Sequence, residues 1–81
     1  MDEKEIYAKL NEIYQRILKK PVVNLGPDTT AADIPGWDSL THTILIDEIE
    51  TTLNIKFKLM EIMNFNNVGD MVACIMKRTK A

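Results

Sequence analysis

The stretch Gly36-Trp37-Asp38-Ser39-Leu40 decides the fold, because a long loop ends there and an amphipathic helix begins. Ser39 is the only serine of the chain. Asp and Ser are among the residues most often found at the N-cap of a helix, so the pair predicts a helix start. A serine hydroxyl at this place lies at the positive end of the helix dipole, beside unpaired backbone N–H groups. It is therefore suited to carrying a phosphate.

Residues 38–53 have the helical period and divide into two faces. The face expected to be buried carries His42, Leu45, Ile46, Ile49 and Leu53. The opposite face carries Leu40, Ile44, Asp47 and Thr51, flanked by Glu48 and Glu50. Two aliphatic side chains are therefore expected to point away from the core within a ring of acids.

Upstream, a second amphipathic helix is predicted over residues 2–19 by the spacing of Ile6, Leu10, Ile13 and Ile17. Asp2 and Glu5 resemble a capping box, and Pro21 is expected to end this helix. Residues 20–37 hold all three prolines and two of the three glycines, so they are predicted to form a long loop. The side chains expected to anchor this loop on the core are Val23, Leu25 and Ile34.

Downstream, residues 59–63 are long enough for about one helical turn, and a last helix is predicted over residues 66–78. Asn66 is its expected N-cap, and Gly69 should cost it roughly 1 kcal/mol relative to Ala. The prediction is an all-α domain spanning 1–81, a small four-helix bundle of three longer helices and one short helix. Its expected core is Ile6, Leu10, Ile13, Leu45, Ile46, Ile49, Leu53, Val68, Val72 and Ile75.

The composition excludes several classes of protein. A net charge of -2 and a pI near 5.3 argue against nucleic-acid binding. No apolar run approaches the ~18 residues of a membrane span, and the N-terminus lacks the apolar core of a signal peptide, so no membrane association and a cytoplasmic location are expected. Cys74 is the only cysteine, which rules out an internal disulfide and a cysteine-based metal cluster, and it is expected to pack. The carboxylates near Asp47 do not have calcium-loop spacing, so no metal site is predicted.

The order of a long helix, a long loop, a helix beginning at Asp38-Ser39-Leu40, a short helix and a final helix resembles the acyl carrier protein family. The resemblance covers nearly all of the chain. It also includes the acids Asp47, Glu48 and Glu50, the segment Ile55-Lys56-Phe57, and Asn66-Asn67-Val68.

This resemblance implies that a separate phosphopantetheinyl transferase, using coenzyme A, esterifies Ser39 with 4′-phosphopantetheine. The thiol of that group would carry an acyl group as a thioester between acyl-loading and acyl-transfer enzymes, and the chain itself would not be an enzyme. Asp38 and Leu40 match the residues beside the attachment point that partner enzymes recognise. The expected docking surface consists of Leu40, Ile44, Asp47, Glu48, Glu50 and Met60. The carrier is expected to be a monomer.

The chain departs from typical fatty-acid carriers at several positions. Thr41 and Ile44 stand where those carriers tend to have acids, and the short helix contains Lys58, Met60 and Met63 in place of several carboxylates. We therefore expect a dedicated carrier for a pathway other than bulk fatty-acid synthesis. An ordinary fatty-acid carrier from a divergent lineage is the alternative.

Two other classes of function fit parts of this pattern. An enzyme would pair Ser39 with His42, but a nucleophile also needs an orienting group, an oxyanion hole and a cleft, and the chain has one histidine. A helical protein-interaction adaptor without a prosthetic group would use Leu40 and Ile44 as anchors, and it would not need the Ser39 hydroxyl. His42 is expected either to pack at the edge of the core or to line the entry to a cargo pocket.

Overall fold

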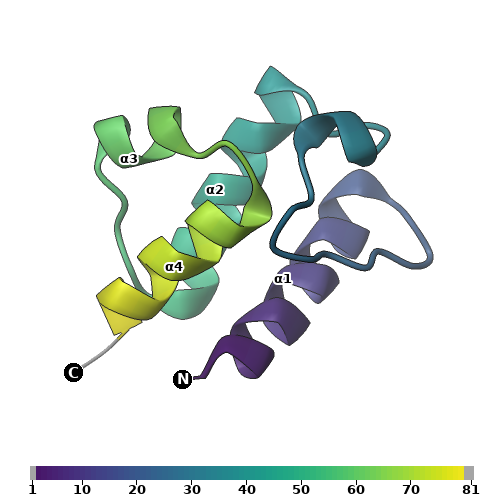
Figure 1. Cartoon of the computed structure of the whole chain (residues 1–81). Helices are drawn as coiled ribbons and strands as arrows, with labels where there is room; N and C mark the ends of the chain where they lie inside the picture. Colours follow the sequence, from purple (N-terminus) through teal and green to yellow (C-terminus); the bar gives the residue numbers. More distant parts are fainter. Residues whose placement is uncertain (1, 80–81) are drawn as a thin grey trace.

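The computed structural model describes residues 2–79, which fold into four α-helices and one short 3-10 helix (Figure 1). The elements are α1 (Glu3–Leu18), η1 (Ala31–Asp33), α2 (Ser39–Leu53), α3 (Leu59–Asn64) and α4 (Val68–Thr79). Residues 2–79 contain no strand, so the predicted all-α class is confirmed. No helix of this part of the chain has the length and apolar character needed to cross a membrane.

Helix α1 starts and stops close to the predicted positions. The Asp2 side chain is the N-cap and accepts a hydrogen bond from the Glu5 N–H at 2.8 Å, which is the Asp2 half of the predicted capping box. The helix ends at Leu18 because Lys19 takes a left-handed backbone conformation, with φ of 55°. Pro21 therefore follows a helix that has already ended.

The core lies where α1 packs against α2 and α4. Every predicted core residue is buried except Leu53, which is half-buried at the last turn of α2. Val23 is buried beneath the long loop, and Leu25 and Ile34 pack against the core from the same loop, as expected. Three buried aromatic side chains were not predicted to belong to the core, namely Tyr14, Trp37 and Phe57.

Helix α4 begins two residues later than predicted, and its N-cap is Asn67 instead of Asn66. The Asn67 Oδ1 accepts a hydrogen bond from the Asp70 N–H at 2.9 Å. The first two N–H groups of α4 donate to the long loop, from Val68 to Thr29 O at 2.8 Å and from Gly69 to Pro27 O at 2.9 Å. The loop thus fixes where α4 starts.

Gly69 is required at this contact. A Cβ atom at that position would lie 2.6 Å from Pro27 O, closer than real Cβ atoms approach a backbone oxygen. Glycine stands here despite its poor helix propensity because the long loop closely approaches the first turn of α4.

Candidate functional site

Asp38 is the N-cap of α2, and Ser39 is the first helical residue, one position later than predicted. The Asp38 Oδ1 accepts hydrogen bonds from the N–H groups of Leu40 and Thr41, both at 3.0 Å. In return, the Thr41 Oγ1 accepts a hydrogen bond from the Asp38 N–H at 2.7 Å. These bonds, led by the one from the Thr41 N–H, hold the pKa of Asp38 below its usual value. The Asp38 carboxylate therefore satisfies two of the backbone N–H groups that were expected to be unpaired at this helix start.

Because Asp38 caps the helix, the Ser39 hydroxyl has no capping role. Ser39 is exposed, and its Oγ takes part in none of the hydrogen bonds found within residues 2–79. Gly36, with a positive φ of 91°, turns the loop into the helix, and the Thr41 Oγ1 donates to Gly36 O at 2.8 Å. Thr41 thus links the turn to the helix, and this link keeps the Ser39 hydroxyl at the surface.

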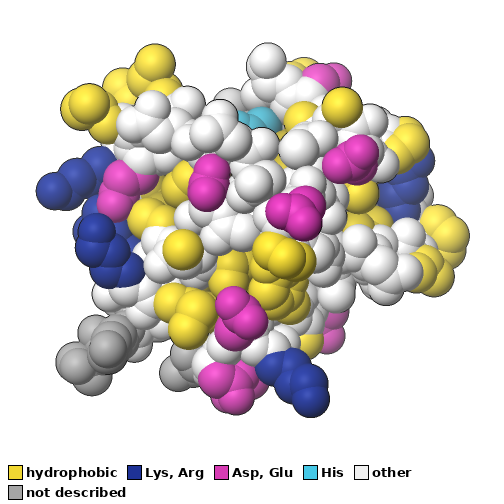
Figure 2. All heavy atoms as spheres, in the orientation of Figure 1, with side chains coloured by type: hydrophobic (Ala, Val, Ile, Leu, Met, Phe, Trp, Pro, Cys, Tyr) yellow, Lys and Arg dark blue, Asp and Glu magenta, His cyan; other side chains and the backbone are white. Residues whose placement is uncertain are grey.

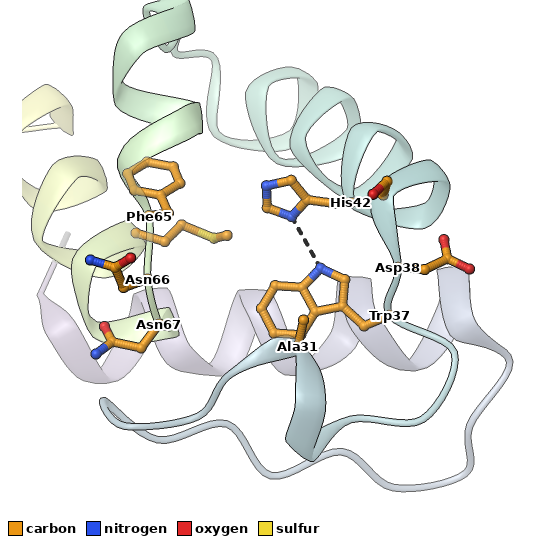
Figure 3. Close-up of a pocket in the computed structure, with 9 residues that line it drawn as sticks. Ala31, Trp37, Asp38, His42, Phe65, Asn66 and Asn67 are labelled. Carbon is orange, nitrogen blue, oxygen red and sulfur yellow. Dashed lines mark hydrogen bonds between the residues drawn. The ribbon is translucent and has the colours of Figure 1, made fainter.

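A pocket of about 380 Å³ opens beside Ser39, between the start of α2 and the segment that joins α3 to α4 (Figure 3). Trp37 and His42 form one side of it, and Phe65, Asn66 and Asn67 form the other (Figure 3). The remaining lining residues are Ala31, Asp38 and Met71. The walls are thus partly aromatic and apolar, with amide side chains at one side.

Trp37 and His42 act as one unit in the wall of this pocket. Trp37 packs edge-on against Tyr14, with ring centroids 5.0 Å apart, and stacks on His42 at 5.8 Å. Its Nε1–H donates to the His42 Nδ1 at 3.0 Å (Figure 3). Burial lowers the pKa of His42, so the ring is neutral at pH 7.

A neutral imidazole that accepts at Nδ1 carries its proton on Nε2. The second ring nitrogen of His42 faces the side of the pocket that holds Phe65 (Figure 3). It offers a hydrogen-bond donor between apolar walls. His42 thus both packs at the edge of the core and lines the pocket. In a serine–histidine pair the Nε2 atom takes the serine proton, and here Nε2 already carries a proton because Nδ1 accepts from Trp37.

Comparison with known proteins agrees with this geometry. A family model described as a phosphopantetheine attachment site matches residues 8–75. The structure is similar to the solution NMR structure of a holo acyl carrier protein from Geobacter metallireducens, with a TM-score of 0.84 and 34% identity over 90% of this chain and 84% of that one. The chain belongs to the acyl carrier protein family. No curated protein matches.

The cofactor of this carrier is a covalently attached 4′-phosphopantetheine. When bound, the group would supply a thiol at the end of a flexible arm. The start of α2 fits such a group, because the Ser39 hydroxyl is exposed and the helix dipole favours a negative phosphate there. The adjoining pocket offers apolar walls together with donors from His42 and the two asparagines.

The expected docking residues of the carrier fall into two groups. Leu40 and Met60 are each 73% exposed, and Ile44 and Asp47 are also exposed. The other two acids contact their own chain. The Glu48 Oε2 accepts from the Arg16 Nη2 at 2.8 Å, which ties α2 to α1.

Glu50 turns toward the segment that follows α2. Its Oε2 accepts a hydrogen bond from the Phe57 N–H at 2.8 Å, and Phe57 is itself buried. The carboxylate therefore supports the short connection between α2 and α3. With Glu48 paired to α1, Asp47 is the one expected docking acid whose carboxylate makes no hydrogen bond or ion pair within residues 2–79.

Helix α3 is fastened to α4 by Glu61. Its carboxylate accepts from the Lys58 N–H at 2.8 Å and from the Cys74 Sγ at 3.4 Å, and it forms an ion pair with Arg78. These contacts, the Lys58 N–H foremost, lower the pKa of Glu61 to about 2. Burial raises the pKa of Cys74, which keeps the thiol protonated and in a packing role.

Sequence reasoning missed most of the pocket lining. Trp37 carried a signal, because it is the only tryptophan and stands next to Asp38 in the motif that defines the site. Phe65, Asn67 and Met71 carried none. They line the pocket beside Ser39 only because the segment that joins α3 to α4 lies opposite the start of α2 (Figure 3).

Proposed function

We propose that this carrier holds an acyl group as a thioester on a 4′-phosphopantetheine arm attached to Ser39, and that it delivers the group between partner enzymes. A phosphopantetheinyl transferase would form the bond between Ser39 Oγ and the phosphorus next to the pantetheine of coenzyme A. The pyrophosphate P–O bond would break, adenosine 3′,5′-bisphosphate would leave, and a base of the transferase would take the serine proton. Acyl-loading and acyl-transfer enzymes would then use the thiol. Asp38 and Leu40 are the residues beside Ser39 that these enzymes would recognise.

The observation that carries this proposal is the uncommitted hydroxyl of Ser39. Serine at a helix start ordinarily serves as the cap. Here Asp38 performs that task with two hydrogen bonds, and Ser39 is left exposed at the first helical position. Such an arrangement leaves the oxygen free to react without weakening the helix.

We also propose that the carrier serves a specialised pathway instead of bulk fatty-acid synthesis. Support comes from the exposed apolar side chains of Ile44 and Met60, where acids are usual in fatty-acid carriers. Efficient cycling of the loaded carrier through a complete fatty-acid synthase would contradict this. A cytoplasmic location and a monomeric state belong to the same proposal.

Intact-protein mass spectrometry tests the attachment. The wild-type carrier, incubated with coenzyme A and a broad-specificity transferase, should gain the mass of one phosphopantetheine group, and Ser39→Ala should gain none. Thr43→Ala is the matched control, because Thr43 is an exposed hydroxyl one turn further along α2 and should leave the mass gain intact. Ser39→Ala should change the free energy of unfolding by less than about 0.5 kcal/mol.

The outcome also separates the carrier from a simple helical adaptor. An adaptor anchored by Leu40 and Ile44 would bind its partner equally well with or without the Ser39 hydroxyl. A wild-type chain that several transferases leave unmodified, while a partner still binds it, would favour the adaptor.

A further inference from the structure

The pocket beside Ser39 contains a donor whose position is fixed and whose hydrogen bond is not used, the Nε2–H of His42. The other ring nitrogen, Nδ1, accepts from the Trp37 Nε1–H at 3.0 Å. An indole N–H can only donate, so Nδ1 carries no proton and the proton of the neutral ring lies on Nε2. Nε2 takes part in no hydrogen bond within residues 2–79. This N–H group therefore remains available to a ligand.

Packing holds the His42 ring in this orientation. The ring stacks on Trp37, with 5.8 Å between centroids and 30° between the two planes. Trp37 is itself buried and packs edge-on against Tyr14, a fully buried residue of α1. A donor that is already fixed in place loses little conformational freedom when a ligand binds, which favours binding.

The surroundings of the His42 donor are apolar, and the ring is open to the outside on one side. Phe65 lies across the pocket from His42 (Figure 3), and Met71, almost fully buried, also lines it. The one cyan side chain in the space-filling view is His42, and part of it is visible at the surface (Figure 2). A ligand that displaces solvent from Nε2 must offer an acceptor oxygen, because an unpaired N–H between apolar walls is costly.

The charges at the pocket favour a neutral acceptor. The His42 ring is uncharged at pH 7, so it offers a hydrogen bond and no ion pair. Asp38 is the one carboxylate among the residues that line the pocket, and it keeps its negative charge while it caps α2. An anionic ligand group would be repelled by Asp38. The carbonyl oxygen of an amide or a thioester meets both requirements.

We propose that His42 donates its Nε2–H to a neutral carbonyl oxygen of the group carried on Ser39, and that Trp37 is the positioning residue that selects this tautomer. The inference rests on the proposed attachment at Ser39 and assigns the place where the attached group rests. Pantetheine has two methyl groups and an amide carbonyl close to its phosphate, and Ser39 itself lines the pocket. The methyl groups contact Trp37 and Phe65, and the carbonyl oxygen accepts from His42. The carbonyl of a loaded acyl group is the second source of the same chemistry.

The test is NMR spectroscopy of the full-length carrier labelled with nitrogen-15, at about pH 7.5, above the usual pKa of histidine. The chain has one histidine and one tryptophan, so the ring nitrogens of His42 and the Trp37 Nε1–H give unambiguous signals. Three samples are compared: the apo carrier, the holo carrier, and the carrier loaded from butyryl-coenzyme A by the transferase. The ring proton should lie on Nε2 in all three.

The exchange of the Nε2–H proton with water reports the hydrogen bond to the attached group. It should slow about tenfold when the group is attached, because the proton is then bound and shielded from solvent. Slowing already in the holo carrier assigns the acceptor to an amide carbonyl of the arm. Slowing that begins only with the butyryl group assigns it to the acyl carbonyl.

Two variants separate the donor from its positioning residue. Trp37→Phe keeps an aromatic ring in the wall but removes the Nε1–H, so part of the His42 proton should move to Nδ1 and the slow exchange should be lost. His42→Phe removes the donor, and the shifts that attachment causes in the Phe65 and Met71 signals should decrease at least about twofold. Thr43→Ala is the control, because Thr43 is exposed on the same helix outside the pocket lining. It should change neither the tautomer nor the exchange.

Three results would overturn the proposal. They are a proton on Nδ1 in the wild-type carrier, an equal Nε2–H exchange rate in all three samples, and a Trp37→Phe protein that is folded by circular dichroism and keeps both the tautomer and the slow exchange. The wild-type samples decide the matter even where a variant does not fold. Mass spectrometry verifies attachment on each sample first. A chain that stays unmodified contradicts the proposed function, whereas unchanged exchange on a fully modified chain contradicts the role of His42 alone.

Discussion

Replacing Gly69 with alanine tests the contact between the long loop and the first turn of α4. Propensity alone predicts that Gly69→Ala stabilises the helix by roughly 1 kcal/mol. The structure predicts the opposite, because the new Cβ would lie 2.6 Å from Pro27 O and 3.2 Å from the Asn67 Oδ1. Neither a backbone carbonyl nor the N-cap is free to move.

The expected loss of unfolding free energy has one of two sources, depending on how the structure responds to the added Cβ. Overpacking of this kind costs typically about 1–3 kcal/mol. If the loop retreats instead, the bonds from Val68 to Thr29 O and from Gly69 to Pro27 O are lost, at about 0.5–1.5 kcal/mol each. After the gain of roughly 1 kcal/mol in propensity, either response should lower the free energy of unfolding by about 1 kcal/mol, which lowers the Tm by about 4–8 °C in a domain of this size.

Urea unfolding and thermal melting followed by circular dichroism measure this loss. Gly26→Ala is the matched control, since its Cβ would lie 3.7 Å from the Thr29 Oγ1, an ordinary contact, and the backbone there is outside the left-handed region. That variant should be unchanged or up to about 1 kcal/mol more stable. A Gly69→Ala protein as stable as wild type would refute the reasoning.

Three further predictions concern the core and two titrating groups. Ile49→Ala removes a fully buried side chain and should lower the free energy of unfolding by about 2–5 kcal/mol in urea titrations. His42 has a folded pKa below the usual 6.5, so stability should fall as the pH drops from 6.5 through the folded pKa, and His42→Phe should remove this slope. Glu61, with a pKa of about 2 against the usual 4.5, contributes stability above pH 4.5 that is lost toward pH 2. Arg78→Ala should reduce that acid loss in part, measured by circular dichroism, because the larger contribution of the Lys58 N–H remains.

The helices and their buried faces were predictable because each depends on the spacing of apolar residues within one short stretch of sequence. The apolar period of Ile6, Leu10 and Ile13 predicted α1, and it agrees with their burial. The start of α4 was placed wrongly because Asn66 and Asn67 are equally good caps by residue type. The choice between them is made by the loop carbonyls that receive the first N–H groups of α4, and that contact joins segments about forty residues apart.

The site was predictable at Ser39 and much less so around it. The motif predicted a helix start at Asp38 and Ser39, and the structure assigns the cap to Asp38. The helical wheel put Glu48 and Glu50 beside the docking face, but it contained no information about α1 or Phe57. Both acids turn toward these neighbours. A pattern along one helix cannot reveal partners on another.

The two ends of the described chain lie at the opposite end of the molecule from the start of α2. The first turn of α1 and the last turn of α4 both lie at the bottom of Figure 1, and α2 begins at the top. A linker, an affinity tag or a tether to a sensor surface can therefore be attached at either terminus without covering the Ser39 end. Immobilised in this way, the carrier would present its reactive end outward to soluble enzymes. The same geometry would let the domain be built into a longer polypeptide with its arm unobstructed.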